Sequence, residues 1–236
     1  MAVPGDDYAF EERCWSEPAK PYDADAIQPW VDMYDGAISY VDAQLGRLRV
    51  ALIERGLADN TLVVIVGDHG ELFGEQGQIM HTWSLYAPVL HVPLVIVSPG
   101  EVPGGLRISD EVTVRDLPAT ILDIVDLAAD SPLPGESWAG LWGLGDGFRG
   151  SSPVLSEAER APDLDFRPRT PLARGDMSAL LEQGPHYIRN GDGSEELYDV
   201  RNDPKLLVDL TPDMAYATAL LRLRGRLDSL DVARER

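Results

Sequence analysis

Two runs of consecutive apolar residues constrain the fold of this chain most strongly: Leu62-Val63-Val64-Ile65-Val66 and Pro93-Leu94-Val95-Ile96-Val97. A strand that is apolar on both faces is typical of a central sheet covered by helices. We therefore expect both runs to lie in one sheet of an α/β protein. The segment between them, residues 67–92, is rich in Gly, His and acidic residues. Because segments that leave strand C-termini line the ligand crevice of open α/β sheets, we expect the chemistry to lie there.

Apolar residues at helical spacing predict two helices beside this sheet. The residues on one face of the first helix step by 3, 4, 3 and 4 along the chain: Ile38, Val41, Leu45, Leu48 and Leu52. Gly56 can end this helix in a left-handed cap. The second helix is expected near residues 114–127, with Leu117, Ile121, Ile124 and Val125 at helical spacing. Residues 1–35 are predicted to form an irregular acidic arm, and residues 130–152 a linker or covering loop.

The last third of the sequence predicts a small antiparallel sheet with one helix. Its expected strands are Pro153-Val154-Leu155-Ser156, His186-Tyr187-Ile188-Arg189 and Glu196-Leu197-Tyr198-Asp199-Val200. The turn sequence Asn190-Gly191-Asp192-Gly193 joins the last two strands, which predicts a hairpin. Leucines at helical spacing over residues 212–230 predict an amphipathic helix that packs on this sheet.

The charge and the cysteine content exclude several classes of function. The chain has 40 acidic and 20 basic residues, a formal charge of -20, which repels nucleic acid and anionic membranes. Cys14 is the only cysteine, so neither an internal disulfide nor a thiolate zinc cluster is expected. The sequence carries neither a signal peptide nor an apolar run of membrane-spanning length, so localisation is unknown and the cytoplasm is the default expectation.

Asp68 and His69 are the candidate metal ligands. They directly follow the first predicted strand, between Gly67 and Gly70, where a tight turn can aim both side chains at one point. A carboxylate oxygen and an imidazole nitrogen suit a divalent cation. On these residues alone, a polar loop or a hydrogen-bonded core histidine is the alternative.

Residues 34–100 resemble the sulfatase family of the alkaline phosphatase superfamily. The resemblance rests on a series of short motifs in the family's order: Tyr34-x5-Tyr40-Val41-Asp42-x3-Gly46-Arg47-Leu48, Gly56-Leu57-Ala58-Asp59-Asn60-Thr61-Leu62-Val63-Val64, Gly67-Asp68-His69-Gly70-Glu71, Gly74-Glu75-Gln76-Gly77, Ser84-Leu85-Tyr86 and Val92-Pro93-Leu94-Val95-Ile96. It implies an α/β fold with the helix-flanked mixed sheet of the alkaline phosphatase/sulfatase type, here incomplete. Residues 1–150 would be the C-terminal part of the catalytic domain, and residues 151–236 a small α+β subdomain with the antiparallel sheet and helix.

The same resemblance implies roles for individual residues. Asp68 and His69 would bind one divalent cation, calcium in most sulfatases, with manganese or zinc as alternatives. His81 would be catalytic, because family members place there a Lys or His that contacts the sulfate and assists departure of the leaving oxygen. Glu71 has two open roles, tuning the metal ligands from outside or capping the turn that follows. His91 is expected to pack beside the second strand, and a sulfate contact by His186 is an open alternative to a structural role.

The family's nucleophile segment, Cys/Ser-x-Pro-Ser-Arg, is missing from this sequence. Cys14 stands in Cys14-Trp15-Ser16-Glu17-Pro18, without the proline and arginine at the required places, so we interpret it as non-catalytic. The acidic pair that completes the family's metal site is also missing. We therefore expect a chain with the second half of a sulfate-ester hydrolase site, inactive alone, and an exposed sheet edge that a separate N-terminal half or an oligomer covers.

Two other hypotheses remain open. The chain could belong to a phosphonate or phosphodiester hydrolase of the same superfamily, because Asp-His-Gly does not distinguish sulfur from phosphorus. It could also be a non-catalytic remnant that acts as a binding module through its exposed sheet edge.

Overall fold

The computed structural model describes residues 24–81, 83–128, 133–143, 153–160 and 170–234 of the chain. These residues form two compact units. Unit 1 contains Asp68–Val92, Leu155–Arg236 and the described residues up to Asp32, and unit 2 contains Met33–Gly67 and Pro93–Val154. The domain boundary that the sequence suggests at residue 150 stays a prediction. The α/β class is confirmed.

The two apolar runs form the strands of unit 2, as predicted. Strand β1 (Val63–Val66) pairs antiparallel with β4 (Leu94–Val97), with Val63 opposite Val97 and Val66 opposite Leu94. The N–H of Gly67 extends this ladder by donating to the carbonyl oxygen of Pro93 at 3.0 Å. The end of β1 and the start of β4 therefore lie together, and the segment between them leaves and re-enters the sheet at the same end of the strand pair.

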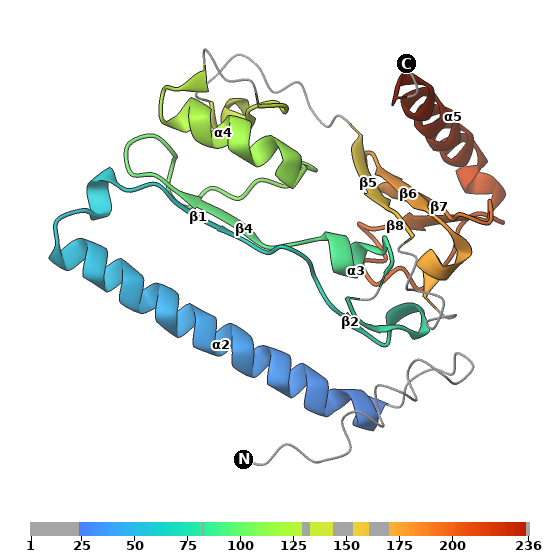
Figure 1. Ribbon diagram of the computed structural model, residues 1–236, viewed down its shortest axis with the longest axis horizontal. Helices are drawn as coiled ribbons and strands as arrows, with labels where there is room; N and C mark the ends of the chain where they lie inside the picture. Colours follow the sequence, from blue (N-terminus) through green and yellow to red (C-terminus); the bar gives the residue numbers. More distant parts are fainter. Residues whose placement is uncertain (1–23, 82, 129–132, 144–152, 161–169, 235–236) are drawn as a thin grey trace. The chain divides into compact units, whose positions relative to one another are not determined.

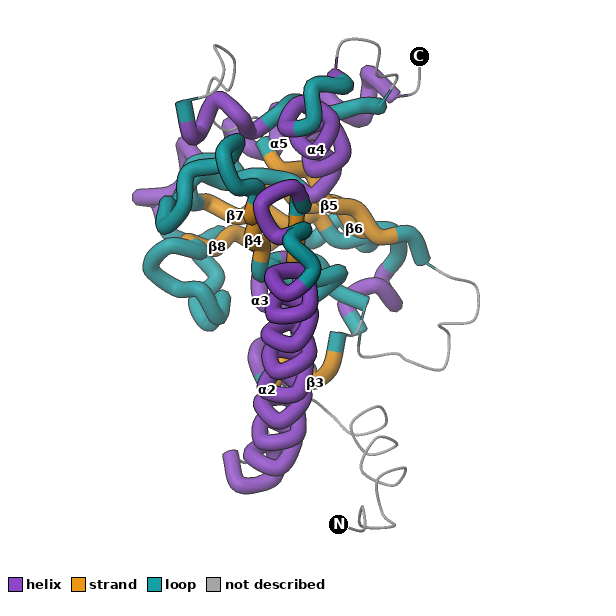
Figure 2. Tube along the Cα trace, turned by 90° about the vertical axis from the view of Figure 1, so that its left-hand side faces the viewer, coloured by secondary structure: helices purple, strands orange, loops and turns teal. Residues whose placement is uncertain are grey.

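Helix α2 (Ala24–Glu54) is longer than the sequence suggested. The prediction of an irregular arm up to residue 35 is wrong for residues 24–35, which are helical in one uninterrupted helix (Figure 2). Pro29 lies near the start of the helix, where it removes only one backbone hydrogen bond. The cap at Gly56 is confirmed, with a φ of 66° and with the N–H of Leu57 donating to the carbonyl oxygen of Leu52 at 2.9 Å.

The apolar face of α2 is not buried among the residues that the structure describes. Ile38, Val41 and Leu48 expose 53%, 54% and 51% of their surface. Their spacing predicted the helix correctly, but a helix of this kind normally gains most of its stability by covering such a face.

Helix α4 (Leu117–Ile124) follows the short 3-10 helix η3 (Val114–Asp116), within the range predicted for it. A second 3-10 helix, η5 (Trp138–Trp142), packs on α4, because the N–H of Trp138 donates to Thr120 Oγ1 at 3.0 Å and the Trp138 side chain is buried. The segment predicted as a linker or covering loop therefore covers α4 over its described part.

Unit 1 is built on a four-stranded sheet of order β5-β6-β7-β8. The strands are β5 (Val154–Ala158), β6 (Met177–Leu181), β7 (Pro185–Arg189) and β8 (Glu195–Asp199). The predicted hairpin is confirmed, with Arg189 opposite Glu195 and the Asn190–Ser194 segment closing it.

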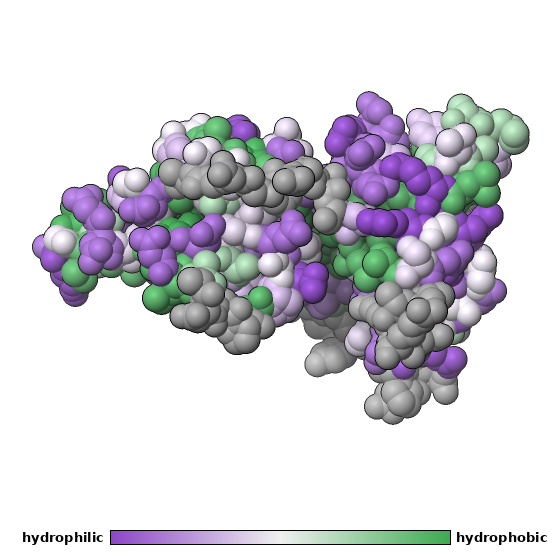
Figure 3. Space-filling model, turned by 90° about the horizontal axis from the view of Figure 1, so that it is seen from above, coloured by the Kyte–Doolittle hydropathy of each residue, from purple (hydrophilic) through white to green (hydrophobic). Residues whose placement is uncertain are grey.

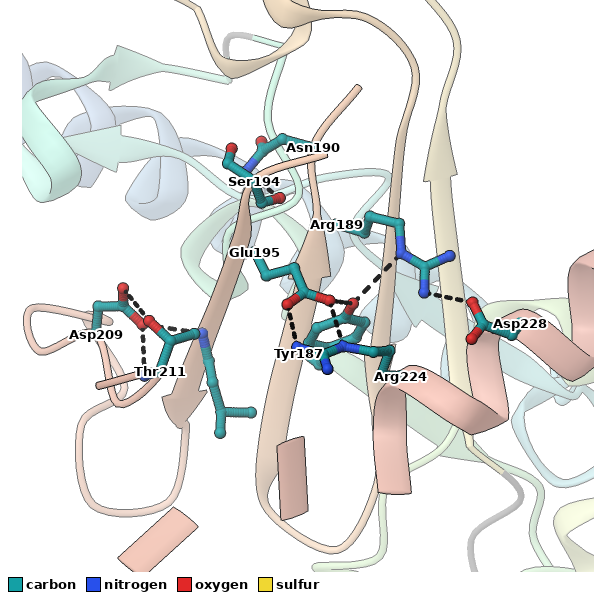
Figure 4. Close-up of polar contacts among 10 residues, drawn as sticks. Tyr187, Arg189, Asn190, Ser194, Glu195, Asp209, Thr211, Arg224 and Asp228 are labelled. Carbon is teal, nitrogen blue, oxygen red and sulfur yellow. Dashed lines mark hydrogen bonds and ion pairs between the residues drawn. The ribbon is translucent and has the colours of Figure 1, made fainter. Parts of the chain in front are cut away.

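Helix α5 (Ala217–Arg234) packs on one face of this sheet (Figure 1). Its fully buried residues Leu223 and Leu227 form a core with three residues of the strands: Leu180, Tyr187 and Leu197. Ion pairs surround this core. Arg224 holds the carboxylate of Glu195 through two hydrogen bonds of 2.8 and 2.5 Å, and Arg189 pairs with Asp228 at 2.6 Å (Figure 4).

The other face of the sheet carries the segment that contains the candidate site residues. Buried residues of that segment pack with residues of the strands and of the turn after β8: Leu72, Leu85, Tyr86 and Val89 with Met177, Ala179, Ile188, Tyr198 and Leu206. The short helix α3 (Ala87–Leu90) lies in this layer. The segment that carries the candidate site therefore packs against the C-terminal sheet.

Polar side chains lie among apolar ones over the face of the molecule shown in Figure 3, as the high proportion of acidic residues predicts. None of the helices in the described part of the chain is long and apolar enough to cross a membrane.

Candidate metal and active site

Asp68 projects into solvent directly after β1. Its side chain is 91% exposed, and the backbone N–H of His69 donates to its Oδ1 atom at 3.0 Å. This N–H, together with the nearby imidazole of His69, holds the pKa of Asp68 below its ordinary value. Asp68 is therefore a charged carboxylate at neutral pH, with its other oxygen, Oδ2, lying 3.8 Å from His69 Nε2.

The ring of His69 is oriented by its own turn. The Nδ1 atom donates to the carbonyl oxygen of Gly70 at 2.9 Å, which leaves Nε2 with a free lone pair for a metal ion. Gly70 is in turn fixed by its N–H, which donates to the carbonyl oxygen of Val89 at 2.7 Å. A Cβ atom at Gly70 would lie 2.0 Å from the backbone oxygen of Pro88, so only glycine fits there.

A small hairpin brings the side chain of His81 next to that of His69. Strands β2 (Leu72–Phe73) and β3 (Ile79–Met80) pair with Leu72 opposite Met80, so the next residues outward, Glu71 and His81, also stand opposite each other. Their side chains meet, with His81 Nδ1 3.2 Å from Glu71 Oε2. The ring of His81 lies against that of His69, with 4.1 Å between centroids and 32° between planes.

The contact between Glu71 and His81 was not foreseen from the sequence. Of the two roles open for Glu71, capping the following turn does not fit, because the 3-10 helix η2 (Glu75–Gly77) begins after Gly74 without a side-chain cap. The signal was present: Leu72-Phe73 and Ile79-Met80 flank a loop with two glycines, a pattern typical of a hairpin. Strands of two residues are too short to show the alternation that predicts a strand.

The hairpin is held by both backbone and side-chain contacts. Gly74 and Gly77 have φ values of 104° and 64°, and the Glu75 carboxylate accepts from the N–H of Phe73 at 2.6 Å. Lys205 lies 3.6 Å from the same carboxylate. Met80, just before His81, also has a positive φ of 64°. Such backbone strain persists only where the surrounding structure enforces it.

Two other histidines lie away from this site. His186 is buried, and its Nε2 atom donates to the carbonyl oxygen of Leu85 at 2.8 Å, so it performs a structural role beneath the site segment. His91 follows helix α3, and its backbone N–H donates to the carbonyl oxygen of Ala87. The residue is exposed, so the expectation that it packs beside the second strand is wrong. Cys14 lies outside the described residues.

The donors around His69 fit a divalent cation. Asp68 offers a charged oxygen and His69 a nitrogen oriented by Gly70. His69, Glu71 and His81 each offer a ligand atom, and these three atoms lie within 4.8 Å of one another. The structure thus brings together Asp68, His69 and His81, all from the Asp68–Val92 segment of unit 1, in which the sequence placed the chemistry.

Comparison with known proteins identifies relatives of this chain. Arylsulfatase K of Bos taurus is 36% identical over 198 residues, which covers 80% of this chain and 34% of that protein. The phosphonate monoester hydrolase of Agrobacterium radiobacter has a similar structure, with a TM-score of 0.70 and 26% identity over 85% of this chain and 40% of that one. A putative sulfatase from Bacteroides thetaiotaomicron shares the fold, with a TM-score of 0.77 and 20% identity over 91% of this chain and 45% of that one.

The chain spans 34% to 38% of the length of curated relatives that include choline-sulfatase of Rhizobium meliloti and an arylsulfatase of Clostridium perfringens. The family model described as Sulfatase matches residues 2–127, more than half of the sequence. This chain therefore belongs to the sulfatase family of hydrolases.

Proposed function

We propose that this chain supplies the second half of a metal-dependent sulfatase site. Sulfatases use a divalent metal, and in this proposal Asp68 and His69 bind it while His81 assists departure of the leaving oxygen of a sulfate ester. The observation that carries the proposal is the 4.1 Å distance between the rings of His69 and His81. It brings a proton-donating group next to a candidate metal ligand.

Calcium is the proposed ion, with manganese and zinc as alternatives. When bound, the cation would neutralise charge on the sulfate oxygens. The exposed carboxylate of Asp68 supplies the hard oxygen that calcium prefers, and His69 adds a neutral nitrogen.

His81 would act on the leaving group. Expelling an alkoxide or phenoxide builds negative charge on the departing oxygen, and a positioned N–H stabilises it. Glu71 accepts from Nδ1 of His81, so donation to the leaving oxygen would come from Nε2–H of a ring that carries both protons. Half of the His81 side chain is exposed, so a substrate can reach it.

The rest of the site would come from sequence outside these 236 residues. We propose that an N-terminal sulfatase segment, in the same polypeptide or in a separate chain, adds the acidic pair, the nucleophile and the arginine. Exposed apolar side chains on α2 support this, since Met33, Ile38, Tyr40, Val41 and Leu48 each expose at least half of their surface. Among the described residues, β1 and β4 pair only with each other, so the sheet is open at both edges.

Metal binding tests the ligand pair directly. Calorimetry with Ca²⁺ and Mn²⁺ should detect binding to the purified chain that is lost in an Asp68→Ala, His69→Ala double variant. Equal binding by both proteins would overturn the assignment of the ligands.

Activity requires the completed site. An N-terminal sulfatase segment added in trans, or fused in front of this chain, should give hydrolysis of an aryl sulfate that a chelator abolishes. We expect His81→Ala to lower the rate by roughly 10²–10⁴-fold, the usual contribution of general acid catalysis. A folded, metal-loaded complex that fails to hydrolyse either sulfate or phosphonate esters would contradict the proposal.

Hydrolysis of phosphonate or phosphodiester substrates is a second candidate, favoured by the similarity to the phosphonate monoester hydrolase of Agrobacterium radiobacter. Matched aryl sulfate and aryl phosphonate esters on the completed enzyme separate the two. A third candidate, a non-catalytic binding module, is favoured by the exposed apolar residues of α2. It requires a stable oligomer that a chelator does not alter in light scattering, and a chelator-sensitive monomer would exclude it.

A further inference from the structure

The three side chains of His69, Glu71 and His81 form a cluster that does not include Asp68. One ligand atom of each lies within 4.8 Å of the other two. The hairpin β2–β3 sets this arrangement, because its register brings Glu71 opposite His81, and the two rings then meet at 4.1 Å. The rings are about half exposed and Glu71 is partly buried, so an ion has access from solvent while the carboxylate is held in place.

The composition of the cluster selects a class of metal. Two imidazoles with one carboxylate form a ligand set typical of Zn²⁺ with an open position, whereas Ca²⁺ and Mg²⁺ prefer oxygen ligands. Two ligands of a tetrahedral Zn²⁺ ion lie about 3.3 Å apart when each bond is about 2.0 Å long. The 3.2 Å between His81 Nδ1 and Glu71 Oε2 is close to this separation, and the ion would take the place of the proton that Nδ1 donates to Glu71, which is released to solvent.

The third ligand is oriented by a backbone contact. Donation from His69 Nδ1 to the carbonyl oxygen of Gly70 at 2.9 Å places the lone pair of the neutral ring on Nε2. A backbone carbonyl on the second nitrogen is the usual way in which proteins fix a metal-binding histidine. Gly70 is itself held by its N–H, which donates to the carbonyl oxygen of Val89.

We propose that His69, Glu71 and His81 form a second metal site, for a late transition-metal cation of the zinc class. An ion in this site would prevent another ion from binding to Asp68 and His69. The two sites share His69, so only one can be filled at a time. An ion in the second site also uses His81 as a ligand and removes it from the leaving group. Zinc would therefore inhibit the hydrolase; only this consequence rests on the proposed function, and binding itself does not.

Zinc calorimetry on the full chain, with four matched variants, tests the site. Glu71→Gln keeps the shape and the hydrogen bond to His81 but removes the charge, and both it and His81→Ala should weaken Zn²⁺ binding by at least about tenfold. Asp68→Ala should weaken Zn²⁺ binding less than either of them, because Asp68 offers no ligand atom to the cluster. His91→Ala is the control for an exposed histidine outside the cluster. Circular dichroism confirms that each variant folds, and absorption of bound Co²⁺ reports the ligand set independently.

The outcomes separate this site from the proposed hydrolytic one. If Asp68→Ala abolishes Zn²⁺ binding and Glu71→Gln does not, the ion sits on the Asp68–His69 pair and the second site is wrong. Absence of Zn²⁺ binding to the unaltered chain also overturns it. Zinc binding that depends on Glu71 and His81, in a chain whose completed form hydrolyses no ester, supports the second site while the proposed function fails.

Discussion

The Nε2 atom of His186 donates a hydrogen bond to the carbonyl oxygen of Leu85 across 2.8 Å. This bond joins strand β7 to the segment that carries His69 and His81, so it anchors the candidate site to the C-terminal sheet. Burial lowers the pKa of His186 below its ordinary value, although the contacts with Leu85 and Glu196 act in the opposite direction. The imidazole is therefore neutral in the folded protein.

Stability should consequently fall in mild acid. In the unfolded chain His186 takes up a proton below a pH of about 6.5, while in the folded chain it takes one up only at lower pH. The unfolded state thus binds more protons, and the contribution of His186 to stability, complete above about pH 6.5, is lost as pH falls toward its folded pKa. Urea unfolding at a series of pH values between about 5 and 7.5 measures this slope.

The variant His186→Gln is the control, because its amide can still donate to Leu85 but does not titrate. We expect it to flatten the dependence of unfolding free energy on pH over this range. An unchanged slope would assign the dependence to other groups. His186→Ala, which loses both the bond and the packing, should cost about 2–4 kcal/mol at neutral pH.

Gly70 should tolerate no side chain. In Gly70→Ala the new Cβ would lie 2.0 Å from the oxygen of Pro88, a backbone atom that cannot rotate away. The turn must then move, together with Asp68 and His69. We expect a loss of about 2 kcal/mol or more in unfolding free energy, the range of overpacked sites, and weaker Ca²⁺ or Mn²⁺ binding.

Gly36→Ala is the matched control for this substitution. Gly36 lies within α2, and a Cβ there meets nothing within 4 Å. It should stabilise the protein by about 0.5–1 kcal/mol, because alanine is the better helix former. Unfolding in denaturant and metal calorimetry on both variants provide the comparison, and a tolerated Gly70→Ala with unchanged metal binding would contradict the turn geometry.

Helix α5 should be held by its leucines more than by its ion pairs. Leu223 is fully buried, so Leu223→Ala should cost about 2–5 kcal/mol. Arg224→Ala breaks the bidentate contact with Glu195, but the arginine side chain is 39% exposed, and solvent screening reduces the expected loss to about 1 kcal/mol. Leu221, on the same helix, is 63% exposed, so Leu221→Ala should change little.

Salt distinguishes these contributions further. Raising the ionic strength should reduce the effect of Arg224→Ala and leave that of Leu223→Ala unchanged, since screening acts on charges. Thermal unfolding at low and high salt gives both values. A larger loss for Arg224→Ala than for Leu223→Ala would show that the ionic contacts drawn in Figure 4 dominate the docking of α5.

The elements that the sequence predicted correctly are those with strong local signals. The apolar runs of β1 and β4, the glycine cap at Gly56 and the turn of the β7–β8 hairpin each depend on a few adjacent residues. The start of α2 was missed because Pro29 and the acidic residues around it favour irregular structure locally, whereas the helix tolerates a proline near its start.

The candidate site was only partly predictable for a related reason. Asp68, His69 and His81 carry a family motif, but the contact of Glu71 with His81 depends on the pairing of β2 with β3. The role of His186 depends on Leu85, a residue 101 positions away, and no local pattern records such a contact. Sequence patterns therefore located the candidate ligands, and the tertiary structure revealed what orients them.

The exposed face of α2 leads to a test of what completes the protein. Ile38→Lys changes a residue that is 53% exposed, so the unfolding free energy of this chain should change by no more than about 0.5 kcal/mol. If an N-terminal sulfatase segment covers this face, the same substitution buries a charge in the completed protein and should weaken assembly by at least about tenfold. Ala43→Lys, which adds the same charge at an exposed position about 140° around the helix from Ile38, is the control. Association measured by calorimetry or light scattering should separate the two variants, and equal assembly by both would show that the α2 face does not contact the segment.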